Sequence, residues 1–184
     1  MKISDIPFED KTFEAAVKAT GAEDSSQVTA ITCRKRSVSS AQGIEYLPNL
    51  KRLDLTRNRL SALDTRQNPM LEELCIGNNQ LETLDLSGNA NLIHLEIFIN
   101  DIATLDLSRV PKLENLYADA NELETLDFSS NLQIDEVKVS DNNLRQITFP
   151  KGCKLSVLQA ENNLLSDEHK AALRVHTQSH RSRI

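Results

Sequence analysis

Four side chains that can bind metals or act in catalysis occur in two matching pairs. Glu73 and Cys75 are two residues apart, and His94 and Glu96 repeat that spacing 21 residues later. Thiolate, imidazole and carboxylate groups are ligands that zinc takes in proteins. A histidine close to a cysteine can also lower the thiol pKa for nucleophilic attack. The pattern therefore raises two hypotheses, a zinc site and a thiol enzyme.

Two other groups of residues have spacings that metal sites use. His176 and His180 are four residues apart, but the tail around them offers no third ligand. A column of aspartates recurs every 21 residues, and stacked carboxylates attract cations such as calcium: Asp64, Asp85, Asp106 and Asp127. An aspartate at a turn more commonly accepts hydrogen bonds from backbone N–H groups. We therefore expect turn caps here, and no metal.

The elements that position these residues follow a strict internal repeat. An asparagine recurs at intervals of 21 residues: Asn58, Asn79, Asn100, Asn121, Asn142 and Asn163. The apolar positions keep the same step, as in the series Leu53, Leu74, Leu95, Leu116, Val137 and Leu158. A fixed period of 20 to 30 residues is typical of solenoids, in which each repeat buries its apolar face against its neighbours.

The repeated pattern L-x-x-L-x-L-x-x-N-x-L from Leu50 to Leu165 is identified as the leucine-rich repeat. Alternating side chains in its LxL segment predict a short strand with one apolar face. The resemblance implies an α/β fold: a right-handed solenoid with a parallel concave β-sheet, an N-terminal helical cap and a short C-terminal helix. We expect the asparagines to hydrogen-bond backbone groups of adjacent coils, and the convex face to be extended or 3₁₀-like.

Three segments follow from this pattern: residues 1–49 as cap and incomplete first repeat, 50–165 as six repeats of 21 residues, and 166–184 as capping helix and tail. A helix is predicted over 8–19, with Gly21 as its stop. Ser166 followed by acidic residues predicts a second helix over about 167–175. The polar residues after it are expected to fray.

The first 50 residues resemble the N-terminal cap of internalin-like bacterial proteins, through FEDKTFEAAV, then VTAITC and then GIEYLPNL. The loop GAEDSSQVTA departs from the calcium-loop pattern of many relatives, so no calcium site is expected. Of the cysteine ladder found in relatives, only Cys33 keeps the inward position, and Cys75 is expected to face outward. The resemblance implies a bacterial protein that is secreted or on the cell surface.

Composition excludes several other classes. The net charge of −6 among 184 residues argues against binding nucleic acid through phosphates. No apolar run of about 18 residues exists to span a membrane. The absence of a signal-like N-terminus in the sequence favours the cytoplasm, against the family resemblance. Three widely spaced cysteines do not form a disulfide framework.

On the predicted concave face the third repeat is unusual, because Phe98 and Ile99 replace polar residues and Tyr117 lies on the next strand. Exposed apolar residues rimmed by charge are typical of protein interfaces. No Lys or Arg occurs between Gln67 and Ser108, which favours a partner with a basic or apolar segment. The predicted partner-binding residues are Phe98, Ile99, Tyr117, His94, Glu96, Asp119 and Glu73.

The sequence thus predicts a monomeric, non-catalytic protein–protein interaction module without cofactor. A metal- or thiol-dependent enzyme at Cys75 and His94 is less favoured, because side chains on an open sheet stand parallel and the face lacks a pocket that excludes water. A structural spacer within a larger bacterial surface protein is the other alternative. For the apolar patch itself, the alternative is that Phe98 and Ile99 fold over the loop edge and pack only on each other.

Overall fold

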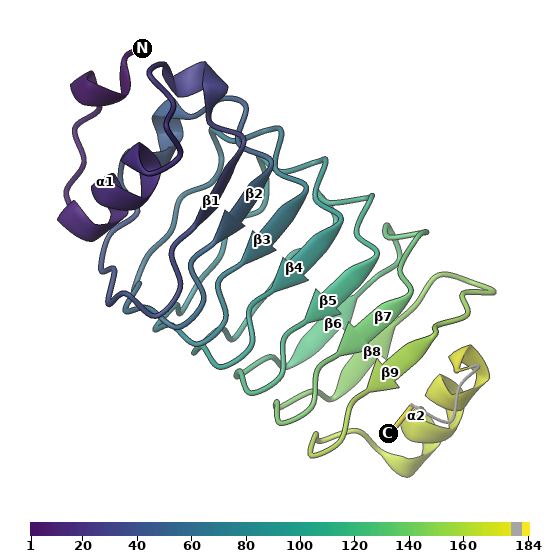
Figure 1. Ribbon diagram of the computed structural model, residues 1–184. Helices are drawn as coiled ribbons and strands as arrows, with labels where there is room; N and C mark the ends of the chain where they lie inside the picture. Colours follow the sequence, from purple (N-terminus) through teal and green to yellow (C-terminus); the bar gives the residue numbers. More distant parts are fainter. Residues whose placement is uncertain (178–181) are drawn as a thin grey trace.

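The computed structural model describes residues 1–177 and 182–184 as one solenoid, in which each coil contributes one strand to a parallel sheet (Figure 1). The strands lie side by side in chain order: β1 (Ala30–Thr32), β2 (Arg52–Asp54), β3 (Glu73–Cys75), β4 (His94–Glu96), β5 (Asn115–Tyr117), β7 (Glu136–Lys138) and β9 (Val157–Gln159). The predicted leucine-rich-repeat solenoid is confirmed. The segment expected as an incomplete first strand is β1, a full member of this sheet.

The 21-residue period equals the sequence offset between paired residues of adjacent strands in the sheet. Leu53 pairs with Leu74, Leu74 with Leu95 and Leu95 with Leu116, each step being one coil. These middle residues of the strands are at most 1% exposed, and so are the apolar residues two positions later, such as Leu55 and Ile97. Stacked aliphatic columns therefore form one continuous core, as the repeat pattern predicts.

The repeated asparagines form a hydrogen-bonded ladder between coils. In Asn100, the side-chain Nδ2 donates to the carbonyl of Ile97 in its own coil at 3.0 Å and to that of Ile76 in the preceding coil at 3.2 Å. Its Oδ1 accepts from the backbone N–H of Leu81 at 3.0 Å. Asn79, Asn121, Asn142 and Asn163 repeat this arrangement. Each asparagine thus satisfies backbone groups that the turn would otherwise leave unpaired.

The opposite side of the solenoid consists mainly of turns. The aspartate column caps them, since Asp85 accepts from the N–H of Ser87 and Asp106 from that of Ser108, both at 2.9 Å. Two segments there form a short parallel ladder, β6 (Thr125–Asp127) with β8 (Gln146–Thr148). The 3₁₀ turns of the described chain lie outside residues 50–165, at Ile3–Asp5, Ser25–Gln27, Ile44–Tyr46 and Arg174–His176.

At the N-terminus, helix α1 (Lys11–Lys18) covers the first coil. The Asp10 carboxylate accepts from the N–H groups of Thr12 and Phe13, and Phe13 and Val17 are fully buried. In the loop that departs from the calcium-binding pattern, Asp24 caps a 3₁₀ turn through the N–H of Ser26.

At the C-terminus, helix α2 (Asp167–Leu173) begins at Ser166, whose hydroxyl accepts from the N–H of His169. The last described residues, 182–184, lie beside β9. Arg183 pairs with Gln159 as a parallel bridge, and its N–H donates to the carbonyl of Leu158 at 2.7 Å. These contacts cover the outer edge of β9 with backbone donors and acceptors. His180 of the candidate histidine pair lies outside the described residues.

Within residues 1–177 and 182–184, no helix has the length and apolar character that crossing a bilayer requires.

Two adjacent asparagines allow the ladder to be tested. Asn142 is 6% exposed and pairs with four backbone groups, whereas Asn143 beside it is exposed. We expect Asn142→Ala to lower the free energy of unfolding by about 2–4 kcal/mol, because buried backbone groups lose their partners. Asn143→Ala should change it by less than about 0.5 kcal/mol. Urea denaturation followed by circular dichroism measures both, and equal losses would contradict the role of the ladder.

Candidate functional site

The predicted site residues lie on the solvent-facing side of the seven-stranded sheet, the predicted concave face (the sheet face below). His94 and Glu96 are the outward residues of β4, Glu73 belongs to β3, and Tyr117 ends β5 opposite Glu96. Phe98 follows β4 by two residues and Asp119 follows β5 in the same way. All are partly buried, whereas Ile99 in the adjacent turn is 49% exposed.

His94, Glu96 and Tyr117 form one connected group. The His94 Nε2 lies 2.9 Å from Glu96 Oε1, and this hydrogen bond lowers the pKa of the Glu96 carboxyl. The rings of His94 and Tyr117 meet edge to face with centroids 5.1 Å apart. The Tyr117 hydroxyl donates to Glu136 at 2.5 Å, and Lys138 lies 3.8 Å from the ring centroid. Burial raises the pKa of Tyr117, so the phenol remains a donor.

Cys75 differs from its expected environment. It belongs to the outward register of β3, yet it is only 2% exposed. Its Sγ lies 3.8 Å from Glu73 Oε1. Burial and the nearby carboxylates of Glu96, Asp54 and Glu73 raise the thiol pKa to about 12. Cys75 thus belongs to the outward face, as expected, but it is buried there instead of accessible to solvent.

The expectation that side chains on this face do not converge is also wrong. One ligand atom each of Cys75, His94 and Glu96 lies within 4.8 Å of the others. The Glu96 carboxylate turns toward His94 within its own strand, while Cys75 stands directly opposite Glu96 on β3. Convergence thus comes from side-chain torsions, which the repeat pattern does not specify.

Phe98 and Ile99 have different environments. A Cβ atom added to Gly77 would lie 2.4 Å from the Phe98 ring, so the ring occupies the space above that glycine, which follows β3. Ile99 instead points to solvent with φ of +53°. Positive φ is disfavoured for any residue with a Cβ and most strongly for β-branched ones. The two residues therefore do not simply bury each other.

The position of Ile99 is left-handed in every repeat. The residue before each ladder asparagine has φ between +53° and +60°: Arg57, Asn78, Ile99, Ala120, Asp141 and Asn162. Ile99 is the β-branched member of this column, and it places an exposed apolar side chain in a strained backbone conformation.

Phe98, Ile99 and Tyr117 form the apolar patch of the sheet face. The acidic residues between Gln67 and Ser108 do not all surround this patch. Asp85 and Asp106 lie in turns on the opposite side. On the sheet face, Glu73 pairs with Arg52 at 2.9 Å, Asp54 pairs with Arg34, and Glu96 bonds to His94. The acidic groups on the face near the patch are therefore paired with basic groups, although no Lys or Arg occurs between Gln67 and Ser108.

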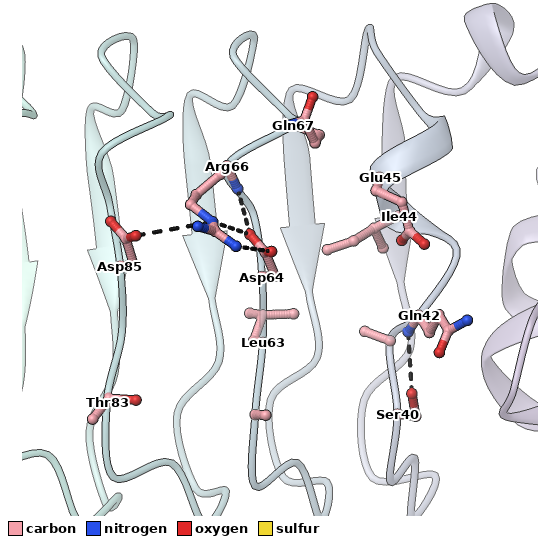
Figure 2. Close-up of a pocket in the computed structure, with 12 residues that line it drawn as sticks. Ser40, Gln42, Ile44, Glu45, Leu63, Asp64, Arg66, Gln67, Thr83 and Asp85 are labelled. Carbon is pink, nitrogen blue, oxygen red and sulfur yellow. Dashed lines mark hydrogen bonds and ion pairs between the residues drawn. The ribbon is translucent and has the colours of Figure 1, made fainter.

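A hollow of about 780 Å³ lies on the opposite side of the solenoid and contains none of the predicted site residues. In Figure 2, Arg66 projects between Asp64 and Asp85 on neighbouring coils. Its guanidinium donates to Asp64 at 2.7 and 3.0 Å, and Asp85 is 3.9 Å away. The Arg66 guanidinium is thus paired with carboxylates of its own and the neighbouring coil.

No protein-family model matches the sequence, and no curated protein matches it. Solved structures do match. An internalin (inlF) from Listeria monocytogenes has a TM-score of 0.81 at 21% identity, covering 100% of this chain and 59% of that chain. The internalin C2 of the same organism has a TM-score of 0.62 at 19% identity, covering 96% and 94%. A chain of the LRIM1/APL1C complex has a TM-score of 0.74 at 23% identity, covering 94% and 33%.

These similarities agree with the expectation, drawn from the sequence, of an internalin-like leucine-rich-repeat fold. The chain spans about three fifths of the inlF chain and one third of the chain from the complex.

The environment of Cys75 predicts low thiol reactivity. With a pKa of about 12, on the order of one Cys75 thiol in ten thousand is ionised at pH 8. Cys153 is more exposed, so we expect iodoacetamide to alkylate Cys153 first and Cys75 only on unfolding. Peptide mass spectrometry of the native chain measures this, with Cys153→Ser as the control. Faster alkylation of Cys75 than of Cys153 would contradict the prediction and favour a thiol enzyme.

The strain at Ile99 predicts a stabilising substitution. We expect Ile99→Asn to raise the free energy of unfolding by about 1 kcal/mol, because Asn tolerates the left-handed region better. Leu164→Asn, at a leucine that is 51% exposed and lacks positive φ, is the control and should give no gain. Urea denaturation compares the two variants, and an unchanged or reduced stability of Ile99→Asn would show that the site is unstrained.

Proposed function

We propose that this solenoid is a non-catalytic protein-interaction module that binds a partner protein on its sheet face. The observation that carries the proposal is Ile99, an exposed apolar side chain in an unfavourable backbone conformation within an otherwise regular column. A residue that costs stability and does not pack in the core is typical of a binding site. The proposed contact residues are Phe98, Ile99, Tyr117, His94, Glu96, Asp119 and Glu73.

The scaffold supports this function physically. Consecutive strands in strict register hold side chains of several coils on one rigid, extended surface. Leucine-rich-repeat neighbours include a protein found in the LRIM1/APL1C complex, which is consistent with a protein partner. Tyr117 is held by both Glu136 and Lys138, so it would lose little side-chain entropy on binding.

The charges favour an apolar over a basic partner segment. Glu73 and Glu96, the acidic residues beside the patch, already have Arg52 and His94 as partners. Asp119 accepts from the N–H of Ser140, and its burial raises the pKa of its carboxyl. A basic segment would have to break these pairs, whereas an apolar side chain can pack beside Phe98 and Ile99 without doing so.

Catalysis is not part of the proposal. The Cys75 thiol is buried and protonated at neutral pH, and His94 is hydrogen-bonded to Glu96 rather than to the sulfur. A nucleophile needs a base within hydrogen-bond reach and an accessible path for the substrate. The spacer hypothesis remains the alternative, and it predicts that no partner is captured.

Binding can be tested with variants on two surfaces. The wild-type chain and three variants are immobilised and exposed to lysates, and retained proteins are identified, purified and titrated by calorimetry. Phe98→Ala/Tyr117→Ala and Ile99→Asn change the patch. Leu132→Glu changes a leucine that is 77% exposed in the turn before β7 and serves as the matched control.

We expect a partner that binds the wild type and Leu132→Glu equally. The double variant should weaken binding by about 30-fold, the effect of losing an interface hot spot of about 2 kcal/mol. Circular dichroism checks that all variants fold. Equal binding by every variant would place the interface elsewhere, and no retained protein would favour the spacer.

A further inference from the structure

Three metal-ligating side chains of different chemistry meet on the floor of the sheet face. Cys75 on β3 is directly opposite Glu96 on β4, and His94 precedes Glu96 by two residues on the same strand. Their sulfur, nitrogen and oxygen ligand atoms lie within 4.8 Å of one another. The thiol is 2% exposed and aimed into this group, whereas the other two side chains are about a quarter exposed.

We propose that Cys75, His94 and Glu96 together bind a zinc ion, with its fourth position open to solvent on the sheet face. The observation behind this inference, the convergence of three ligand atoms, does not depend on the proposed partner binding, although His94 and Glu96 are also proposed contact residues. Zinc accepts thiolate, imidazole and carboxylate ligands in one tetrahedral site, and an exposed fourth position is filled by water.

The required rearrangement is small. Tetrahedral bonds of about 2.0–2.3 Å place ligand atoms about 3.5 Å apart. The separations of up to 4.8 Å must therefore shrink by about 1 Å, while His94 Nε2 and Glu96 Oε1, now 2.9 Å apart, must separate slightly. Torsions of the Glu96 and Cys75 side chains suffice for changes of this size. Binding exchanges the His94–Glu96 hydrogen bond for two metal bonds. The proton of that hydrogen bond leaves Nε2 and the imidazole is reprotonated at Nδ1 by solvent, while the thiol proton is released to solvent, so one proton is released in all.

Surrounding residues hold the ligands in place. Tyr117 packs edge to face on the His94 ring at 5.1 Å, and Glu136 fixes Tyr117 in turn. Ordered residues behind the ligands raise the affinity of metal sites, because they orient the ligand atoms before the ion arrives.

The charges nearby also favour a cation. Glu73 Oε1 is 3.8 Å from the Cys75 sulfur, and Glu73 and Asp54 are each paired with a single arginine. Conversion of the thiol to a thiolate beside Glu96 adds negative charge that a divalent ion neutralises. Sulfur as a ligand selects zinc over magnesium and calcium, which prefer oxygen.

Cobalt(II) is a spectroscopic probe for this site, because cobalt–thiolate bonds give a charge-transfer absorption in the near ultraviolet. We expect the reduced wild-type chain to develop this absorption with one equivalent of cobalt and to lose it when zinc is added. Cys33→Ser and Cys153→Ser remove the other two cysteines and should leave the absorption unchanged. Cys75→Ser should abolish it.

His94→Gln and Glu96→Gln provide a second test that does not alter the buried cysteine. Each should weaken zinc binding by at least about tenfold in a competition titration, because each removes one of the three protein ligands. Glu122→Gln, at an exposed glutamate outside the cluster, is the matched control and should bind zinc like the wild type.

Three results would overturn the proposal. They are the absence of a thiolate absorption in the folded wild type, its persistence in Cys75→Ser, and unchanged zinc affinity in both His94→Gln and Glu96→Gln. Because these measurements use the free chain, they do not depend on whether a partner is found. Repeating the partner titration with a chelator shows separately whether the metal contributes to that binding.

Discussion

The structure depends on the hydrogen bonding of one asparagine in each coil, which is buried or partly buried. A solenoid coil must turn away from its strand and return within 21 residues, which exposes backbone donors and acceptors to an apolar core. The asparagine amide satisfies a carbonyl of its own coil, a carbonyl of the preceding coil and an N–H of that coil. Together with the parallel strand pairing, these hydrogen bonds fix the spacing between coils. They therefore set the register in which every strand, and every side chain on the sheet face, is placed.

That register made much of the fold predictable. The asparagine column, the inward aliphatic columns and the aspartate turn caps all follow from residue type at a fixed step, because each coil repeats the environment of the last. A second asparagine column was not predicted from the sequence. Asn68, Asn89 and Asn131 also bond backbone carbonyls of neighbouring coils, but Val110 interrupts the series. Of these three, only Asn89 has a donor for its side-chain oxygen, supplied by Thr65, so this column is less regular and harder to recognise.

The strands and face that carry the candidate site could be predicted from the sequence, but the side-chain conformations and contacts within it could not. Repeat position correctly put Cys75, His94 and Glu96 on one face in two adjacent strands. It could not give their torsions, and these determine that the carboxylate turns toward the imidazole and that the thiol is covered. Nor could it show that Phe98 lies over Gly77, because that contact depends on the glycine leaving room in the neighbouring coil. Pairwise side-chain packing within a face is set by residues of both coils, whereas the repeat pattern describes one coil at a time.

The residues that depart from the repeat pattern on the sheet face lie in its middle strands, and this location has a physical reason. The strained Ile99 raises the free energy of its own coil, and each coil is stabilised mainly by its two neighbours. The coils that carry β3, β4 and β5 are stacked on both sides by coils with complete asparagine pairing. A terminal coil has one such neighbour and would fray under the same cost. An interior position thus lets the chain keep unfavourable residues on its surface without losing the fold, and this is where a binding surface built from them is most stable.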